Sequence, residues 1–162
     1  MNSSQSASVS PLDPANRRMV ILTDGYSNPL TAKTACCVLR YCPSEVVAVL
    51  DRQAAGQTAQ ALLGVGGSIP VVDGIGAAPR AQSLLIGIAP PGGKIPAEWR
   101  PIVLEAIGKG MTIYSGLHDF LSHDSEFVEA ASASGAQLVD VRRNEERDVA
   151  NRVGIRDQCL RI

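Results

Sequence analysis

The sequence has few aromatic residues, almost no surplus charge and no long apolar run, and each shortage excludes a class of protein. Trp, Tyr and Phe make up 4% of the 162 residues, so the core must be aliphatic, as is typical of a buried parallel sheet. The formal net charge of −1 gives no electrostatic reason to expect a nucleic acid or an anionic membrane as a partner. No run approaches the roughly 18 apolar residues that a membrane-spanning helix needs.

The cysteines predict no metal site, because none of them forms a CxxC pair and the two histidines are not spaced with them as zinc ligands. The four are Cys36, Cys37, Cys42 and Cys159. We therefore expect free thiols in a reducing cytoplasm. Residues 1–18 lack the apolar core of a secretory signal and are rich in Ser and Pro, so we predict a disordered lead there.

Short aliphatic runs alternate with helical patterns along the rest of the chain. The runs predict strands at residues 19–23, 46–51, 69–72, 84–89, 111–115 and 137–141. Helices are predicted at residues 31–41, 57–63, 97–109 and 124–134. The apolar runs are continuous rather than alternating, so both faces of each strand should be covered.

This alternation predicts an α/β fold, because strands separated by helices form right-handed βαβ crossovers. We predict one Rossmann-like, doubly wound domain over residues 19–142, with a mostly parallel six-stranded sheet and helices on both faces. Residues 143–162 are rich in arginine, mixed with Glu and Asp. A run of mixed charge is typical of a solvated segment, so we predict a charged linker or tail there.

Polar or Gly-rich residues follow five of the predicted strands. In open α/β sheets, ligands bind outside the carboxyl ends of the strands, near the point where the strand order reverses. We therefore predict a binding site for a small anionic ligand at this edge. Its candidate residues are Asp24, Gly25, Thr31, Lys33, Thr34, Asp51, Pro90, Pro91, Gly92, Gly93, Lys94, Ser115 and Gly116.

The turn after the first strand would bring Thr31, Lys33 and Thr34 to the start of a helix. Free backbone N–H groups, the helix dipole and the lysine charge attract an anion there. The alternative is that Thr31 is an N-cap and Lys33 is solvated. Asp51 lies 26 residues after Gly25, near the separation of about 20 residues at which a Rossmann acid holds a ribose hydroxyl. It could equally be a turn aspartate.

The segment IGIAPPGGKIPAEWR, at residues 86–100, is the most distinctive in the chain. Pro90 and Pro91 remove N–H donors, while Gly92 and Gly93 permit close approach of the backbone to another group. This combination suits a flat or phosphorylated ligand lying over the loop. The alternative is a rigid turn that sets the direction of the following helix.

His118 is the candidate proton-transfer residue, because it follows the fifth predicted strand in the segment SGLHD. A loop histidine is more often a surface residue. No GxSxG motif surrounds Ser115, so no catalytic triad is predicted.

No glycine fingerprint supports a bound dinucleotide. Gly25 is the only glycine in the turn after the first strand, and the Gly74-Ile75-Gly76 segment is too close to the next strand for a crossover helix. Lys94 is followed by Ile95, so no P-loop is present either. NAD is therefore disfavoured as a cofactor, and acetyl-CoA or another nucleotide remains open.

Four stretches together resemble a bacterial and archaeal family of two-domain proteins long described as having unknown function. They are TAKTACCVLRYCPSEVVAVLD, LLGVGGSIPVV, LLIGIAPPGGKIPAEWRPIVLEAIGKGMTIYSGLHDFLSHD and LVDVRR. The resemblance implies an N-terminal Rossmann-like domain followed by a C-terminal P-loop NTPase-like domain. Some members are D-glutamate N-acetyltransferases. This chain stops near the point where relatives begin the second domain, so only the N-terminal domain is expected here, as an excised domain or as a naturally short relative.

Two hypotheses follow from the residues and the resemblance. The first is the ligand-binding half of a cytoplasmic enzyme, which would bind an acyl-CoA, a nucleotide or an amino-acid substrate, and which alone would be inactive. The second is a non-catalytic assembly or regulatory module that contacts the P-loop domain or a partner subunit through its Arg-rich end, with a homo-oligomer left open.

Overall fold

The computed structural model of the chain describes residues 18–143. The lead and the charged tail predicted from the sequence therefore lie outside the described residues, apart from Arg18 and Arg143. The described chain forms a six-stranded parallel sheet in the order β3-β2-β1-β4-β5-β6. The strands are β1 Met19–Leu22, β2 Val46–Leu50, β3 Val71–Val72, β4 Ser83–Ile86, β5 Thr112–Ser115 and β6 Gln137–Asp140.

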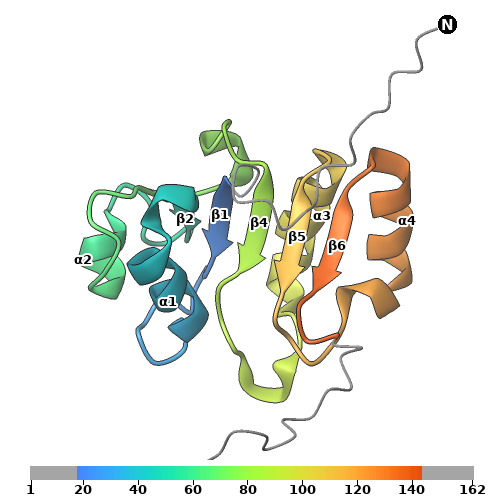
Figure 1. The fold of residues 1–162 in the computed structure, drawn as a ribbon, viewed down its shortest axis with the longest axis horizontal. Helices are drawn as coiled ribbons and strands as arrows, with labels where there is room; N and C mark the ends of the chain where they lie inside the picture. The colour runs from blue at the N-terminus through green and yellow to red at the C-terminus, as the bar shows by residue number, and fades with distance from the viewer. Residues whose placement is uncertain (1–17, 144–162) are drawn as a thin grey trace, which may run out of the picture.

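This strand order is that of a doubly wound Rossmann fold, and it confirms the predicted fold class. The chain builds outward from β1 to β3, then returns to the centre and builds outward from β4 to β6 (Figure 1). Because parallel crossovers are right-handed, the two halves place their helices on opposite faces of the sheet. The order reverses between β1 and β4, which lie side by side. That point is where ligands usually bind in such sheets.

Four helices cover the sheet, and each begins later in the chain than the sequence predicts. They are α1 Lys33–Tyr41, α2 Ala59–Leu63, α3 Arg100–Gly108 and α4 Ser125–Ser134. The residues ahead of α3 and α4 form separate 3-10 turns, Ala97–Trp99 and Leu121–His123. Proline explains the later start of α3, because Pro101 lacks the N–H that a helix beginning at Ala97 would need there.

The core is aliphatic, as the shortage of aromatic residues requires. All four residues of β1 are buried, so both faces of the central strand are covered. Trp99 is the largest side chain that is fully buried. It sits at the carboxyl edge of the sheet, where its indole N–H donates to the main-chain oxygen of Asp24, which follows β1 (2.9 Å). One aromatic residue therefore closes the space where the strand order reverses.

Gly87 lies where the chain leaving β4 passes closest to the end of β1. A Cβ atom at Gly87 would lie 2.5 Å from Cγ2 of Ile21 and 3.0 Å from the main-chain oxygen of Leu22. The Gly87 N–H donates to that same oxygen (2.9 Å), and the Gly87 carbonyl accepts the N–H of Ala35 in α1 (2.9 Å). Glycine is therefore needed here for the close packing of β4, β1 and the start of α1.

We expect Gly87→Ala to lower the free energy of unfolding by about 1–3 kcal/mol, because the added methyl group overpacks a rigid backbone contact. Urea denaturation followed by circular dichroism measures the change. Gly108→Ala is the matched control, since a Cβ atom there meets nothing within 4 Å. Equal unfolding midpoints for the Gly87→Ala and unchanged proteins would contradict the packing argument.

Candidate functional site

The loops that leave the strands at the carboxyl edge form two groups of contacts. One group surrounds Asp24 and Asp51, after β1 and β2. The other lies between the β4–α3 loop and the segment that joins β5 to α4, and it encloses a cavity. The sequence predicts a single crevice at this edge, so the outcome for each candidate residue depends on the group to which it belongs.

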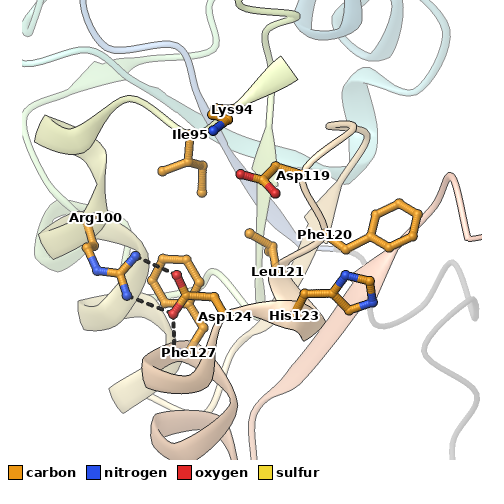
Figure 2. A pocket seen from close by; sticks show the side chains of 9 residues that line it. All are labelled: Lys94, Ile95, Arg100, Asp119, Phe120, Leu121, His123, Asp124 and Phe127. Carbon is orange, nitrogen blue, oxygen red and sulfur yellow. Dashed lines mark hydrogen bonds and ion pairs between the residues drawn. The ribbon is translucent and has the colours of Figure 1, made fainter. Parts of the chain in front are cut away.

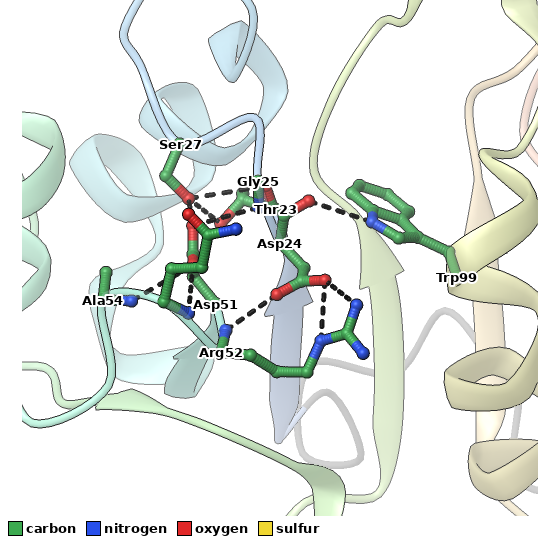
Figure 3. Close-up of polar contacts among 9 residues, drawn as sticks. Thr23, Asp24, Gly25, Ser27, Asp51, Arg52, Ala54 and Trp99 are labelled. Atoms are coloured by element: carbon green, nitrogen blue, oxygen red, sulfur yellow. Dashed lines mark hydrogen bonds and ion pairs between the residues drawn. The ribbon is translucent and has the colours of Figure 1, made fainter.

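Asp51 is buried, and its carboxylate is fully engaged by the protein. One oxygen accepts the N–H of Gln53 (3.0 Å) and of Ala54 (3.2 Å). The other accepts the N–H of Gly25 (3.3 Å) and the hydroxyl of Ser27 (Figure 3). A carboxylate offers about four acceptor positions, so this set is complete. The bonding favours the turn-aspartate alternative, in which Asp51 organises the loop after β1.

Asp24 forms the second carboxylate of this group and pairs with Arg52. Its side chain accepts the Arg52 backbone N–H (2.7 Å) and two guanidinium N–H groups (2.9 and 2.6 Å). Burial would raise the pKa of Asp24, but the hydrogen bonds and charge of Arg52 outweigh it and hold that pKa below its ordinary value. Tyr26 packs edge-on against Trp99, with ring centroids 5.7 Å apart. Protein groups thus fill the position where a Rossmann fold usually admits a ligand.

The start of α1 differs from the predicted anion site. The helix begins at Lys33, and Ala32 occupies the N-cap position without a side-chain cap, so the predicted start at Thr31 is wrong by two residues. The Thr31 hydroxyl instead donates to the main-chain oxygen of Tyr26 (2.6 Å). Lys33 and Thr34 are exposed. Neither residue lines the cavity at the neighbouring loops.

The proline- and glycine-rich loop after β4 packs against the loop after β5. Pro91–Gly93 form a 3-10 turn, and Gly92 and Gly93 both have positive φ angles, 79° and 66°. The carbonyl of Gly93 accepts the N–H of Asp119 (3.1 Å). A Cβ atom at Gly93 would lie 2.8 Å from Cβ and Cδ2 of His118. His118 therefore rests on the backbone of this loop, and it does not line the cavity.

Ser115 and Gly116 serve the end of the sheet. Ser115 is buried, and its hydroxyl accepts the N–H of Leu117 (3.2 Å). The carbonyl of Gly116 accepts the Nε–H of Arg142 (2.7 Å). These bonds secure the turn after β5 to the chain that leaves β6, so they position the neighbouring cavity without forming its wall.

The cavity has a volume of about 210 Å³ and lies between the β4–α3 loop and the start of α4 (Figure 2). It is lined by Lys94, Ile95, Arg100, Asp119, Phe120, Leu121, His123, Asp124 and Phe127. Lys94 and Asp119 are exposed, and within residues 18–143 their charged groups make no side-chain hydrogen bond or ion pair. The cavity thus presents one free cation and one free carboxylate to a ligand.

Arg100 is held in the cavity wall by two carboxylates. It forms a two-pronged contact with Asp124 (2.7 Å for both bonds) and donates Nε–H to Glu126 (2.6 Å). Its guanidinium carbon lies 4.4 Å from the centre of the Phe127 ring. The hydrogen bonds from Arg100 hold the pKa of Asp124 below its ordinary value. These contacts fix the guanidinium group and leave one N–H of its Nη1 atom without an acceptor among residues 18–143.

Of the candidates predicted from the sequence, only Lys94 lines the cavity. Asp24, Gly25 and Asp51 form the separate group around Trp99. The other lining residues were missed, although the signal was present in part. The Trp-Arg pair that ends the distinctive loop segment and the phenylalanine after Asp119 are unusual in so aromatic-poor a chain.

Metal ligation and membrane spanning find no support in the described part of the chain. No set of three or more His, Cys, Asp or Glu side chains gathers among residues 18–143 in a way that could hold a metal ion. Within the same residues, none of the helices has the length and apolar character to cross a membrane. The three described cysteines, Cys36, Cys37 and Cys42, are free thiols.

The order and parallel direction of the six strands define this protein as a Rossmann-like domain. Comparisons with known proteins agree. A family model matches residues 52–144, which is more than half of the chain. It describes a Rossmann-like domain of unknown function, DUF1611_N. The chain belongs to this family.

A solved structure of a DUF1611 family protein from Anabaena variabilis is 33% identical, with a TM-score of 0.71. The match covers 82% of this chain and 39% of that protein.

Two curated relatives are similar over a shorter stretch. Proteins named D-glutamate N-acetyltransferase, from Tritonibacter scottomollicae and from a Pseudoalteromonas species, are each 40% identical over 62 residues. The matched segment spans 38% of this chain and 19% of each relative. These relatives therefore contain much more chain than is matched here.

The pair of Asp24 and Arg52 predicts a stability that depends on pH. The pKa of Asp24 is lower in the folded protein, so the pair stabilises the fold above the ordinary value of 3.8. The contribution is lost as the pH falls through the lowered value. Asp24→Asn should therefore lower the urea midpoint at pH 7. The variant should also lose less stability than the unchanged protein between pH 5 and pH 2.

Circular dichroism at several pH values measures both effects. Asp73→Asn is the control, because Asp73 follows β3 at the same edge, is exposed and has no side-chain partner within residues 18–143. If Asp24→Asn and Asp73→Asn gave the same profile, the pair would not stabilise the fold.

Proposed function

We propose that this domain binds a small amino-acid-sized ligand in the cavity beside Lys94, as one part of an amino-acid-modifying enzyme. The observation that carries the proposal is the cavity itself, at the carboxyl edge of a parallel sheet, with an unpaired lysine and an unpaired aspartate on its rim. Ligands of α/β sheets bind at this edge.

The charges of the cavity suit a molecule that carries both a carboxylate and an ammonium group. Lys94 and the remaining N–H of Arg100 would bind a carboxylate, and Asp119 would bind an ammonium group. The side chains of Ile95 and Leu121 supply an apolar wall for a short carbon chain. The names of the curated relatives, D-glutamate N-acetyltransferase, support a ligand of this chemistry.

The size of the cavity favours an amino acid over the larger ligands predicted as alternatives. Sites for drug-sized ligands usually enclose about 300–1,000 Å³. The cavity measures about 210 Å³, too little for a whole nucleotide or coenzyme A. Near the point where the strand order reverses, Trp99 is fully buried and the Asp51 carboxylate already accepts N–H groups of the protein, which disfavours a dinucleotide there. An acyl donor would therefore require surfaces beyond this cavity.

Calorimetric titration of the whole chain with D-glutamate, acetyl-CoA, ATP and NAD tests the proposal. We expect D-glutamate to bind, and Lys94→Ala to weaken that binding at least about tenfold, since it removes the free cation. Lys109→Ala is the matched control, because Lys109 is exposed at the opposite edge and pairs with Glu105.

Two outcomes would contradict this location of the site. Absence of heat with all four compounds would contradict ligand binding itself. Binding that Lys33→Ala abolishes and Lys94→Ala leaves intact would move the ligand to the start of α1.

A further inference from the structure

A second hollow lies at the opposite edge of the sheet, between the end of α1 and the glycine-rich turn that joins α2 to β3 (Figure 1). It is an open groove with a volume of about 560 Å³. We propose that this groove binds the phosphate group of a small phosphorylated compound. The inference is independent of the proposed function, because the cavity beside Lys94 lies at the other edge.

The side chains of the groove favour an anion. Among the described residues that line it, Arg40 is the only charged one. Arg40 is exposed in the last turn of α1, and it makes no side-chain hydrogen bond or ion pair within residues 18–143. Glu45, the nearest carboxylate along the chain, does not line the groove. The hydroxyl groups of Ser44 and Ser68 add neutral donors at its rim. An anion in the groove would therefore meet one cation and no carboxylate.

The glycine-rich turn adds donors from the main chain. The N–H groups of Val65–Ser68 have no acceptor among residues 18–143. The carbonyl of Gly66 accepts the N–H of Ile69 (3.2 Å), and the carbonyl of Gly67 accepts the N–H of Gln60 (3.3 Å). In a planar trans peptide the N–H points away from the carbonyl to which it is joined. In both peptides the following N–H group is therefore directed away from these protein partners and is free to donate to a ligand.

The turn is packed against both helices, so its donors are already in place. Gly66 and Gly67 have φ angles of 100° and 57°, which glycine adopts at little cost. A Cβ atom at Gly66 would lie 2.8 Å from Cβ of Ala59 in α2 and 3.0 Å from Cδ2 of Leu39 in α1. Binding to groups that are already ordered avoids much of the entropy cost of fixing a loop.

This donor set matches a phosphate group better than a carboxylate. Successive backbone N–H groups in turns form anion sites, and arginine binds phosphate through paired hydrogen bonds. A phosphate presents more acceptor oxygens than a carboxylate, so it can use the arginine and the turn together. The groove is also larger than a phosphate needs, since sites for small molecules usually enclose about 300–1,000 Å³. Val65 and Ile69 supply apolar surface for the organic part of the ligand.

Nuclear magnetic resonance of the whole chain, labelled with ¹⁵N, tests the site. The probes are adenosine monophosphate, orthophosphate and acetate, each titrated at the same ionic strength. We expect adenosine monophosphate to move the amide signals of Val65–Ser68 and to bind more tightly than orthophosphate. Acetate should leave these signals in place.

Two variants with matched charge changes test the role of the arginine. Arg40→Ala should raise the Kd for adenosine monophosphate at least about fivefold, because a charge-assisted hydrogen bond is lost. Lys33→Ala should leave that Kd unchanged, since Lys33 is an exposed cation at the other end of the same helix. Circular dichroism checks that both variants are folded.

Four results would overturn the inference. They are unmoved signals at Val65–Ser68 with both phosphate probes, equal shifts with acetate, equal affinity for orthophosphate and adenosine monophosphate, and unchanged affinity in Arg40→Ala. None of them bears on D-glutamate binding beside Lys94, so the two sites are tested separately.

Discussion

The contact between the Trp99 indole and the main-chain oxygen of Asp24 organises the carboxyl edge of the sheet. It joins the start of the α3 region to the end of β1 across the point where the strand order reverses. A fully buried indole of this size removes the space that a Rossmann fold usually leaves open. The remaining cavity lies one strand further along, between the loops after β4 and β5. The domain thus keeps the Rossmann sheet, and this cavity lies at a different part of its edge from the point where the strand order reverses.

The charged residues of this edge divide according to their partners. Asp51 and Asp24 accept bonds from the protein at almost every position, so they stabilise the loops. Lys94 and Asp119 have no such partners among the described residues and face a hollow. A carboxylate that already accepts several protein hydrogen bonds has few positions left for a ligand, whereas exposed charged groups without protein partners can exchange water for one. Location at the correct edge is therefore a weaker sign of function than the absence of a partner.

This division explains how far the sequence could predict the structure. Continuous aliphatic runs separated by helices were sufficient for the fold class and the six strands, because burial on both faces leaves a strong local pattern. The edge that carries Lys94 could also be predicted, since parallel strands all end there. The partners of Asp51 and the position of the Trp99 ring could not, because they depend on contacts across 24 to 75 residues of chain. The start of α3 was placed too early for a local reason, the proline at its second residue.

Asp124 is shared by two parts of the structure. The same carboxylate accepts the N–H of Phe127, in the first turn of α4, and two N–H groups of Arg100, the first residue of α3. The wall of the cavity and the start of α4 are therefore held by the same carboxylate. The shape of the hollow and the first turn of the neighbouring helix consequently depend on a single pair of oxygens.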